Sequence, residues 1–266
     1  MNVLNFISYR SRQMIGRLLL DFLFPPTCPN CGAPVNEQGE WCPECFDSVL
    51  AIRQVPSELL QSLNEAWILA HYTGGVKTMI YDVKFNAKKE QSKGAVPFLR
   101  CFDFYMNKHE LNLRPHLVVP IPTSKGKLKT RGYNQVDLLF KEWVYEKNKG
   151  VVNHELHNGK RVVKKMRDTI VRDNNIHAYW RWCDCLHKLD TGKDMWSLTG
   201  NERRKNVSDA FMMKAIYRNV AFWTNCDVLL IDDIYTTGAT LEAAAHIIQS
   251  YHPHTIKALT LASGAY

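Results

Sequence analysis

The feature that most restricts the fold of this chain is a short apolar run, residues 228–231, followed at once by two carboxylates. Such a run is too short for a buried helix and has the length of a strand covered on both faces, as in a parallel sheet. After Asp232 and Asp233 come a loop of small residues, 236–240, and a helical pattern. This order predicts a strand, a turn and a helix, the repeating unit of α/β proteins.

The rest of the chain shows the same alternation of predicted strands and helices. Apolar patterns predict further strands at 66–72, 117–121 and 255–262, and helices at 76–85, 95–106, 134–146 and 240–251. Residues 147–197 depart from it, and we expect them to form an insertion outside the core sheet. We therefore divide the chain into an N-terminal helix with a four-cysteine module, residues 1–60, and a larger α/β domain, residues 61–266.

The chain is basic, with a formal net charge of +8, which favours anionic partners without choosing among them. A chain of 266 residues can bury a core without disulfides. Charged residues interrupt the apolar pattern of residues 3–23, so this segment predicts neither a signal peptide nor a spanning helix. We expect a packed helix there; the alternative is a basic amphipathic helix on a membrane surface. The expected location is the cytoplasm.

Four of the eight cysteines form two C-x-x-C pairs near the N-terminus, at Cys28, Cys31, Cys42 and Cys45. Thiolates on two tight knuckles reach one tetrahedral zinc ion together, and Gly32 supplies a permissive backbone after the first pair. Because four cysteine ligands leave no open position, the pattern predicts a structural zinc site rather than a catalytic one. A redox dithiol is the competing interpretation. Cys183 and Cys185 lack a second pair nearby and are interpreted as ordinary thiols.

The turn after residues 228–231 has the chemistry of a sugar-phosphate site. Backbone N–H groups at a helix N-terminus attract an anion, threonine hydroxyls add donors, and a glycine allows close approach. Two carboxylates at the strand end can accept hydrogen bonds from vicinal ribose hydroxyls. The predicted binding residues are Asp232, Asp233, Thr236, Thr237, Gly238, Ala239 and Thr240.

Residues 228–240 resemble the signature with which type I phosphoribosyltransferases bind phosphoribosyl pyrophosphate (PRPP). The resemblance implies a type I phosphoribosyltransferase-like, mainly parallel sheet flanked by helices. It also implies that Asp232 and Asp233 hold the ribose hydroxyls, and that residues 236–240 wrap the 5′-phosphate. A Mg²⁺ ion would be held chiefly by the pyrophosphate and ribose oxygens of PRPP.

A cationic segment follows the strand at 117–121, where charge would accumulate on a leaving pyrophosphate. Lys84, Lys125 and Arg131 are the candidate pyrophosphate ligands.

The ordered motifs resemble the ComF family of competence-associated proteins. They are the four-cysteine module, residues 83–85, residues 120–135 with Arg-Gly-Tyr-Asn-Gln, residues 202–211 and the PRPP signature. The resemblance implies a bacterial, cytosolic protein linked to DNA uptake in natural transformation.

Two functions follow from this pattern. The first is a magnesium-dependent phosphoribosyltransferase with an unidentified acceptor and no identifiable general base. The second is a non-catalytic PRPP sensor, or a factor that binds DNA-uptake proteins or single-stranded DNA. For DNA, the basic residues 160–167 would act with Tyr179, Trp180 and Trp182. The competing interpretation of that segment is a solvated helix face with hydrophobic packing.

Overall fold

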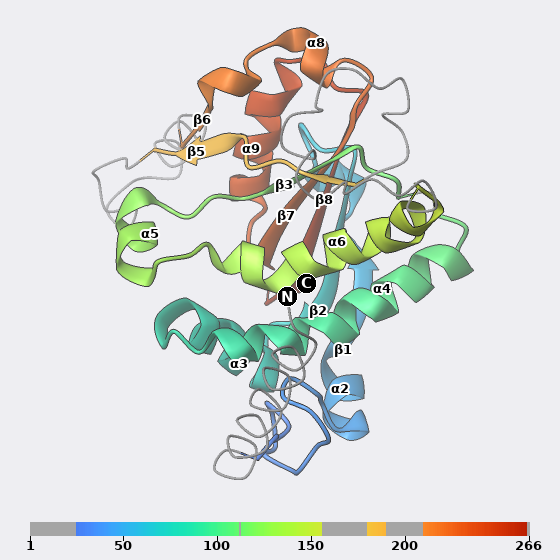
Figure 1. The fold of residues 1–266 in the computed structure, drawn as a ribbon, viewed down its shortest axis with the longest axis vertical. Coiled ribbons are helices and arrows are strands. Elements are labelled where there is room, and N and C mark those ends of the chain that lie inside the picture. The colour runs from blue at the N-terminus through green and yellow to red at the C-terminus, as the bar shows by residue number, and fades with distance from the viewer. Residues whose placement is uncertain (1–24, 112, 156–179, 190–209, 265–266) are drawn as a thin grey trace, which may run out of the picture.

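A computed structural model describes residues 25–111, 113–155, 180–189 and 210–264. Its main sheet has six strands in the order β1-β2-β8-β7-β3-β4 (Figure 1). The strands of this sheet are β1 (Leu50–Gln54), β2 (Glu65–His71), β3 (Leu117–Pro120), β4 (Arg181–Trp182), β7 (Asp227–Tyr235) and β8 (Thr255–Ser263). All neighbouring pairs are parallel except β1 with β2. A separate antiparallel pair is formed by β5 (Leu186–Lys188) and β6 (Phe211–Met213).

Helices cover both faces of the sheet. They are α2 (Pro43–Val49), α3 (Gly74–Phe85), α4 (Val96–Lys108), α5 (Lys125–Arg131), α6 (Gln135–Glu155), α8 (Val220–Trp223) and α9 (Ala239–Gln249), with short 3₁₀ turns at Ser57–Leu59, Lys89–Ala95 and Ala215–Tyr217. The predicted fold class is confirmed: a mainly parallel sheet flanked by helices, with a small four-cysteine cluster near the N-terminus. This architecture is consistent with the type I phosphoribosyltransferase-like fold.

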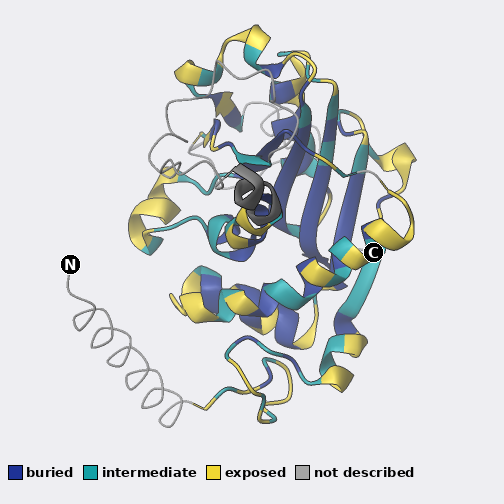
Figure 2. Ribbon diagram, turned by 45° about the vertical axis from the view of Figure 1, so that its right-hand side comes forward, coloured by how far each residue is buried: buried dark blue, intermediate teal, exposed yellow. Residues whose placement is uncertain are grey.

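The sheet separates two hydrophobic cores. One core lies under α3, α4 and α6 and includes Trp41 and Val49 from the four-cysteine segment. The other lies under α9 and includes Leu186 and Phe211 from the β5–β6 pair. Figure 2 shows the buried residues concentrated along the strands and on the helix faces that meet them. Each face of the sheet is thus closed by a different part of the chain.

The connections change direction between β3 and β7. The chain leaves β3 through α5 and α6 towards β4 at one edge of the sheet, and leaves β7 through α9 towards β8 on the other side. α6 and α9 pack into different cores, on opposite faces. In open α/β sheets, a ligand crevice lies outside the carboxyl ends of the strands at such a switch point. The fold therefore predicts a ligand site at the carboxyl ends of β3 and β7.

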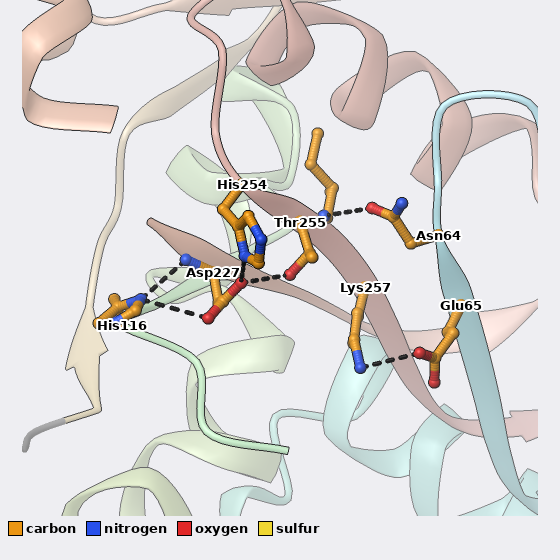
Figure 3. Close-up of polar contacts among 8 residues, drawn as sticks. Asn64, Glu65, His116, Asp227, His254, Thr255 and Lys257 are labelled. Atoms are coloured by element: carbon orange, nitrogen blue, oxygen red, sulfur yellow. Dashed lines mark hydrogen bonds and ion pairs between the residues drawn. The ribbon is translucent and has the colours of Figure 1, made fainter. Parts of the chain in front are cut away.

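At the opposite, amino edge, polar contacts tie the starts of the strands together (Figure 3). Oδ1 of Asp227 accepts a hydrogen bond from Oγ1 of Thr255 at 2.7 Å and lies 2.8 Å from Nδ1 of His254. The Asp227 N–H donates to Nδ1 of His116 at 2.8 Å. Burial raises the pKa of Asp227, but the contacts with Thr255, His254 and His116 outweigh it and lower the pKa below its ordinary value. These residues bind one another, so we interpret the cluster as structural.

Two expectations change with the structure. Arg181–Trp182 pairs in parallel with β3, so the expectation that all of residues 147–197 lie outside the core sheet is wrong for β4. β1 lies inside the range 1–60, so the sheet takes an edge strand from the segment that we assigned to the zinc module. The division at residue 60 otherwise stays a prediction.

Residues 3–23 and 160–167 lie outside the described residues. Among the described helices, none combines the length and the apolar character needed to cross a membrane.

Candidate functional site

The two carboxylates lie within β7 rather than after it. β3 ends with Pro120 opposite Ile231, whereas β7 continues alongside β8 to Tyr235. Asp232 and Asp233 therefore stand just beyond the end of β3, at the carboxyl edge of the sheet. Their side chains are nevertheless enclosed, with only 8% and 3% of the residue surface exposed. Adjacent buried carboxylates are costly unless a cation or a ligand meets them.

Lys84 of α3 meets the pair. Its ammonium lies 2.8 Å from Oδ2 of Asp233. In the part of the chain that the structure describes, that buried oxygen has no hydrogen-bond partner apart from this ion pair. Oδ1 of Asp232 accepts the N–H of Asp233 at 2.8 Å. Burial, followed by the neighbouring charge of Asp233, raises the pKa of Asp232 to about 8, against the lowering effect of that N–H, Lys84 and Lys188. Asp232 thus holds a proton near neutral pH, while the negative charge of Asp233 is balanced by the ammonium of Lys84.

The turn after β7 is shaped by Gly238. Its φ is +76°, in the left-handed region, and it precedes the first turn of α9. A Cβ at this position would lie 2.4 Å from the hydroxyl oxygen of Tyr235, so a side chain has no room. Thr236 and Thr237 are exposed, and Oγ1 of Thr237 accepts the Ala239 N–H at 3.4 Å. The turn presents hydroxyls and a helix N-terminus beside the acidic pair, which is an arrangement suited to an anion.

The cationic segment after β3 folds as the short helix α5. Ser124 begins it by accepting the Lys127 N–H at 3.5 Å, and Gly132 ends it with φ +81°. Arg131 contacts Oε1 of Gln135, and its guanidinium lies 5.8 Å from the centre of the Phe85 ring. Arg131 therefore flanks the end of α3 that carries Lys84, whereas Lys125 is exposed at the start of α5.

The four cysteines of the N-terminal segment converge. The sulfur atoms of Cys28, Cys31, Cys42 and Cys45 all lie within 4.8 Å of one another, and Sγ of Cys31 is 3.7 Å from Sγ of Cys42. A tetrahedral Zn²⁺ with Zn–S bonds of about 2.3 Å would separate its sulfur ligands by about 3.8 Å. The geometry fits that ion. Gly32 has φ +75°, as expected for the turn after the first pair.

The cysteine cluster is attached to the α/β domain by aromatic side chains. Nε1 of Trp41 donates a hydrogen bond to the carbonyl oxygen of Gly94 at 3.0 Å. The Trp41 and Phe46 rings lie 5.4 and 4.8 Å from the ring of Phe98 on α4. The cluster therefore shares a core with the domain rather than standing apart from it.

Comparisons with known proteins bear on the N-terminal segment and on the chain as a whole. Residues 19–56, which contain all four clustered cysteines, match the family model described as a double zinc ribbon domain. The chain is also similar to Competence protein F of Haemophilus influenzae. The two are 23% identical over 242 residues, which span 89% of this chain and 84% of that protein. The two matches support a ComF-family protein with a zinc module.

The zinc prediction is supported by both the matched domain and the cysteine geometry. The remaining site assignments stay predictions. The structure brings Lys84 to the acidic pair and places Arg131 beside Phe85. Lys125 has an exposed position on α5. Residues 202–209 of the family motif lie outside the described residues.

Sequence reasoning missed one cation of the site. Lys188 lies on β5, inside the range we assigned to an insertion, and its Nζ is 5.6 Å from the centre of the Phe211 ring on β6. Burial lowers the pKa of Lys188, and the charges of Asp232 and Asp233 raise it while Lys127 and Lys84 lower it. Lys188 therefore lies close enough to Asp232 and Asp233 for their charges to act on it. No local pattern marked it, because β5 is only three residues long.

Among the described residues of the assigned insertion, Trp180, Cys183 and Cys185 serve packing. The Trp180 ring meets Trp143 of α6 edge-on, with centres 5.2 Å apart. Its backbone N–H and C=O are both bound by the side-chain amide of Asn148. Cys183 and Cys185 are buried, and burial raises the pKa of Cys185 well above its ordinary value. These contacts favour the packing interpretation of Trp180 over an open stacking surface for DNA.

Proposed function

We propose that this chain binds PRPP with Mg²⁺ at the carboxyl ends of β3 and β7, and acts as a phosphoribosyltransferase. The observation that carries the proposal is the enclosed pair of Asp232 and Asp233, with Lys84 at 2.8 Å, next to the glycine turn that opens α9. Buried carboxylates need polar partners. A ribose diol supplies two hydroxyl donors to them, and the 5′-phosphate suits the N-terminus of α9.

The lysines near the acidic pair are suited to bind the pyrophosphate of PRPP. Lys84 of α3 and Lys188 of β5 lie near the acidic pair, and the charge of Lys127 on α5 acts on Lys188. In the transfer, a nitrogen of the acceptor bonds to C1 of the ribose while the bond from C1 to pyrophosphate breaks, and the pyrophosphate leaves with the electron pair. Cations placed where that charge develops would stabilise the transition state. We assign the same role to Arg131 and Lys125 of α5.

Mg²⁺ fits this site as an ion carried by the substrate. In the described parts of the chain, the four cysteines form the group of three or more His, Cys, Asp or Glu side chains close enough to share a metal. The acidic pair thus offers two carboxylates rather than a full set of ligands. Mg²⁺ commonly binds through one or two carboxylates together with substrate phosphates and water. When bound, it would neutralise charge on the pyrophosphate.

Similarity to Competence protein F supports a competence-associated role, and we assign the chain to the cytoplasmic handling of DNA during uptake.

The decisive experiment is calorimetric titration of PRPP with Mg²⁺ into the wild-type chain and into Asp232→Asn/Asp233→Asn. We expect binding by the wild type and a loss of at least about tenfold in the double variant, because Asp233 loses the charge with which it accepts a ribose hydroxyl and Asp232 loses one of its two carboxyl oxygens. Equal affinity in both proteins would refute the site.

A second measurement separates the enzyme from the sensor. Pyrophosphate release is followed with PRPP, Mg²⁺ and each common nucleobase in turn. Release that depends on one base and disappears in Asp232→Asn/Asp233→Asn supports transfer. Tight PRPP binding without release for any acceptor supports the non-catalytic alternative. Ribose 5-phosphate and pyrophosphate, titrated separately, show which half of the site each variant affects.

A further inference from the structure

Asn30, in the first knuckle of the zinc module, contacts two parts of the molecule. Its Nδ2 donates a hydrogen bond to Sγ of Cys45 at 3.2 Å. Its Oδ1 accepts the backbone N–H of Gly75 at 2.7 Å. One amide side chain thus connects a zinc ligand with the first turn of α3, although Asn30 and Gly75 are 45 residues apart in the sequence.

The start of α3 depends on this contact. The residue at its N-cap, Thr73, makes no side-chain hydrogen bond to the helix. Asn30 therefore supplies, from a distant segment, the acceptor that a capping residue normally gives to the N2 amide. Gly74 and Gly75 make the approach feasible: a Cβ on either residue would lie 2.3 or 2.7 Å from atoms of Asn30. The two glycines and Asn30 fit one another closely.

The far end of α3 carries Lys84. Between Gly75 and Lys84 the helix runs for about 14 Å, at 1.5 Å per residue. Its buried side chains include Val76, Met79, Ile80 and Val83, so it is packed along its length. The carbonyl oxygen of Val83 also accepts the Tyr133 hydroxyl at 2.6 Å, which ties this end to the segment after α5. The same helix thus carries the Asn30 contact at its first turn and, near its end, the lysine paired with Asp233.

We propose that Asn30 couples the zinc module to the candidate phosphate site, by holding one end of α3 to the zinc ligand Cys45 while the other end supplies Lys84. An N–H···S hydrogen bond needs its sulfur held in place, and metal ligation at Cys45 would fix it. Loss of the metal would release Cys45 and, through Asn30, the cap of α3. The PRPP readout of this coupling rests on the proposed function, but the effect on α3 does not.

The test uses the full chain loaded with zinc and compares Asn30→Ala, Asn30→Asp and Asn36→Ala with the wild type. Asn36 is an exposed asparagine of the same module and serves as the matched control. Amide hydrogen exchange in residues 75–84 is the deciding measurement. We expect exchange to be about fivefold faster or more in Asn30→Ala, PRPP affinity to weaken by a similar factor, and Asn36→Ala to match the wild type.

Asn30→Asp separates the two contacts. A carboxylate still accepts the Gly75 N–H and is favourable at a helix N-terminus, so exchange in α3 should stay close to the wild-type rate. It cannot donate to Cys45 near neutral pH. With Co²⁺ replacing zinc, both Asn30 variants should therefore shift the sulfur-to-metal charge-transfer band, whereas Asn36→Ala should not.

Unchanged exchange of α3 in Asn30→Ala overturns the coupling, whether or not that variant keeps its zinc. Faster exchange in Asn30→Ala with its zinc content unchanged supports the coupling, whereas faster exchange confined to zinc-free protein counts against it, because metal loss would also disturb the core that the module shares with α3. If the wild-type chain fails to bind PRPP, the proposed function is wrong, and the exchange measurement still decides the role of Asn30. If PRPP binds equally to all variants although exchange changes, α3 is coupled to zinc but does not transmit the effect to the site.

Discussion

Lys84 and Asp233 form an ion pair of 2.8 Å that joins the last turn of α3 to the carboxyl end of β7. The lysine is 20% exposed and the aspartate 5% exposed at their side chains, so the pair lies at the boundary between core and solvent. It connects a helix on one face of the sheet with the strand that carries the acidic pair. We therefore expect this ion pair to contribute to the stability of the fold and, at the proposed site, to PRPP binding.

Lys84→Met should weaken PRPP binding and destabilise the fold, because the substitution leaves Asp233 enclosed without its cation. Removal of one partner from a buried pair costs about 3 kcal/mol. Urea unfolding measures this loss. Lys84→Met/Asp233→Asn should recover most of the stability while PRPP binding stays weak. A double variant as unstable as the single one would show that the ion pair is not the cause.

Asp232→Asn should stabilise the chain at pH 8 while abolishing tight PRPP binding. The carboxyl pKa is raised from 3.8 to about 8, so the folded chain keeps a proton that the unfolded chain loses. Stability then falls as pH rises from about 4 to about 8, by an amount on the order of 3–5 kcal/mol. The neutral amide removes this slope. Denaturation midpoints across this pH range test it, and an unchanged slope in the variant contradicts the assignment.

Gly238→Ala should distort the turn before α9. The added Cβ meets the Tyr235 hydroxyl, and φ of +76° is strained for alanine. We expect a loss of about 1–3 kcal/mol in the free energy of unfolding and a greater than tenfold weaker affinity for PRPP. Gly126→Ala, on the neighbouring α5, where a Cβ meets no atom within 4 Å, is the control. Similar effects from both substitutions would rule out the steric explanation.

Lys188→Met should weaken binding of pyrophosphate, and Lys188→Arg should restore it. Because the pKa of Lys188 is lowered, wild-type affinity should decline at a lower pH than for an ordinary lysine, and arginine should remove this decline. Lys257→Met, which removes a cation paired with Glu65 at the opposite edge of the sheet, controls for net charge. Equal affinity in Lys188→Met and Lys257→Met would exclude Lys188 from the site.

Cys42→Ser should lower the zinc content of the purified chain and its thermal stability. The substitution removes one of four sulfur ligands whose positions fit a tetrahedral ion. Cys101→Ser, which alters a cysteine of α4 outside the cluster, is the matched control. Zinc content is measured by atomic absorption. Zinc retained in full by Cys42→Ser would refute the four-ligand site.

The sequence predicted those elements whose signals are local. The apolar run at 228–231 marked β7, and the two C-x-x-C pairs marked the cysteine cluster. The end of β7 was missed because Asp232 and Asp233 resemble the start of a loop, whereas pairing with β8 extends the strand to Tyr235. Tertiary hydrogen bonds thus overrode the local pattern.

Residues whose roles depend on distant partners could not be predicted. Lys188 is an ordinary lysine in a three-residue strand until pairing with β6 places it within reach of the charges of the acidic pair. Asn30 is one polar residue between two cysteines, and its bond to Gly75 spans the module and the domain. β4 has two residues, too few for any periodicity, and is a strand because β3 lies beside it.

The separation of the two cores by the sheet has a consequence for divergence. Trp41 and Val49 share a core with α3, α4 and α6, whereas Leu186 and Phe211 share the other with α9. Substitutions around the β5–β6 pair can therefore alter what lies over the acidic pair without repacking the metal-binding side. Each face of the sheet can therefore tolerate change with little effect on the packing of the other face, so the molecule is divided across its thickness as well as along its length.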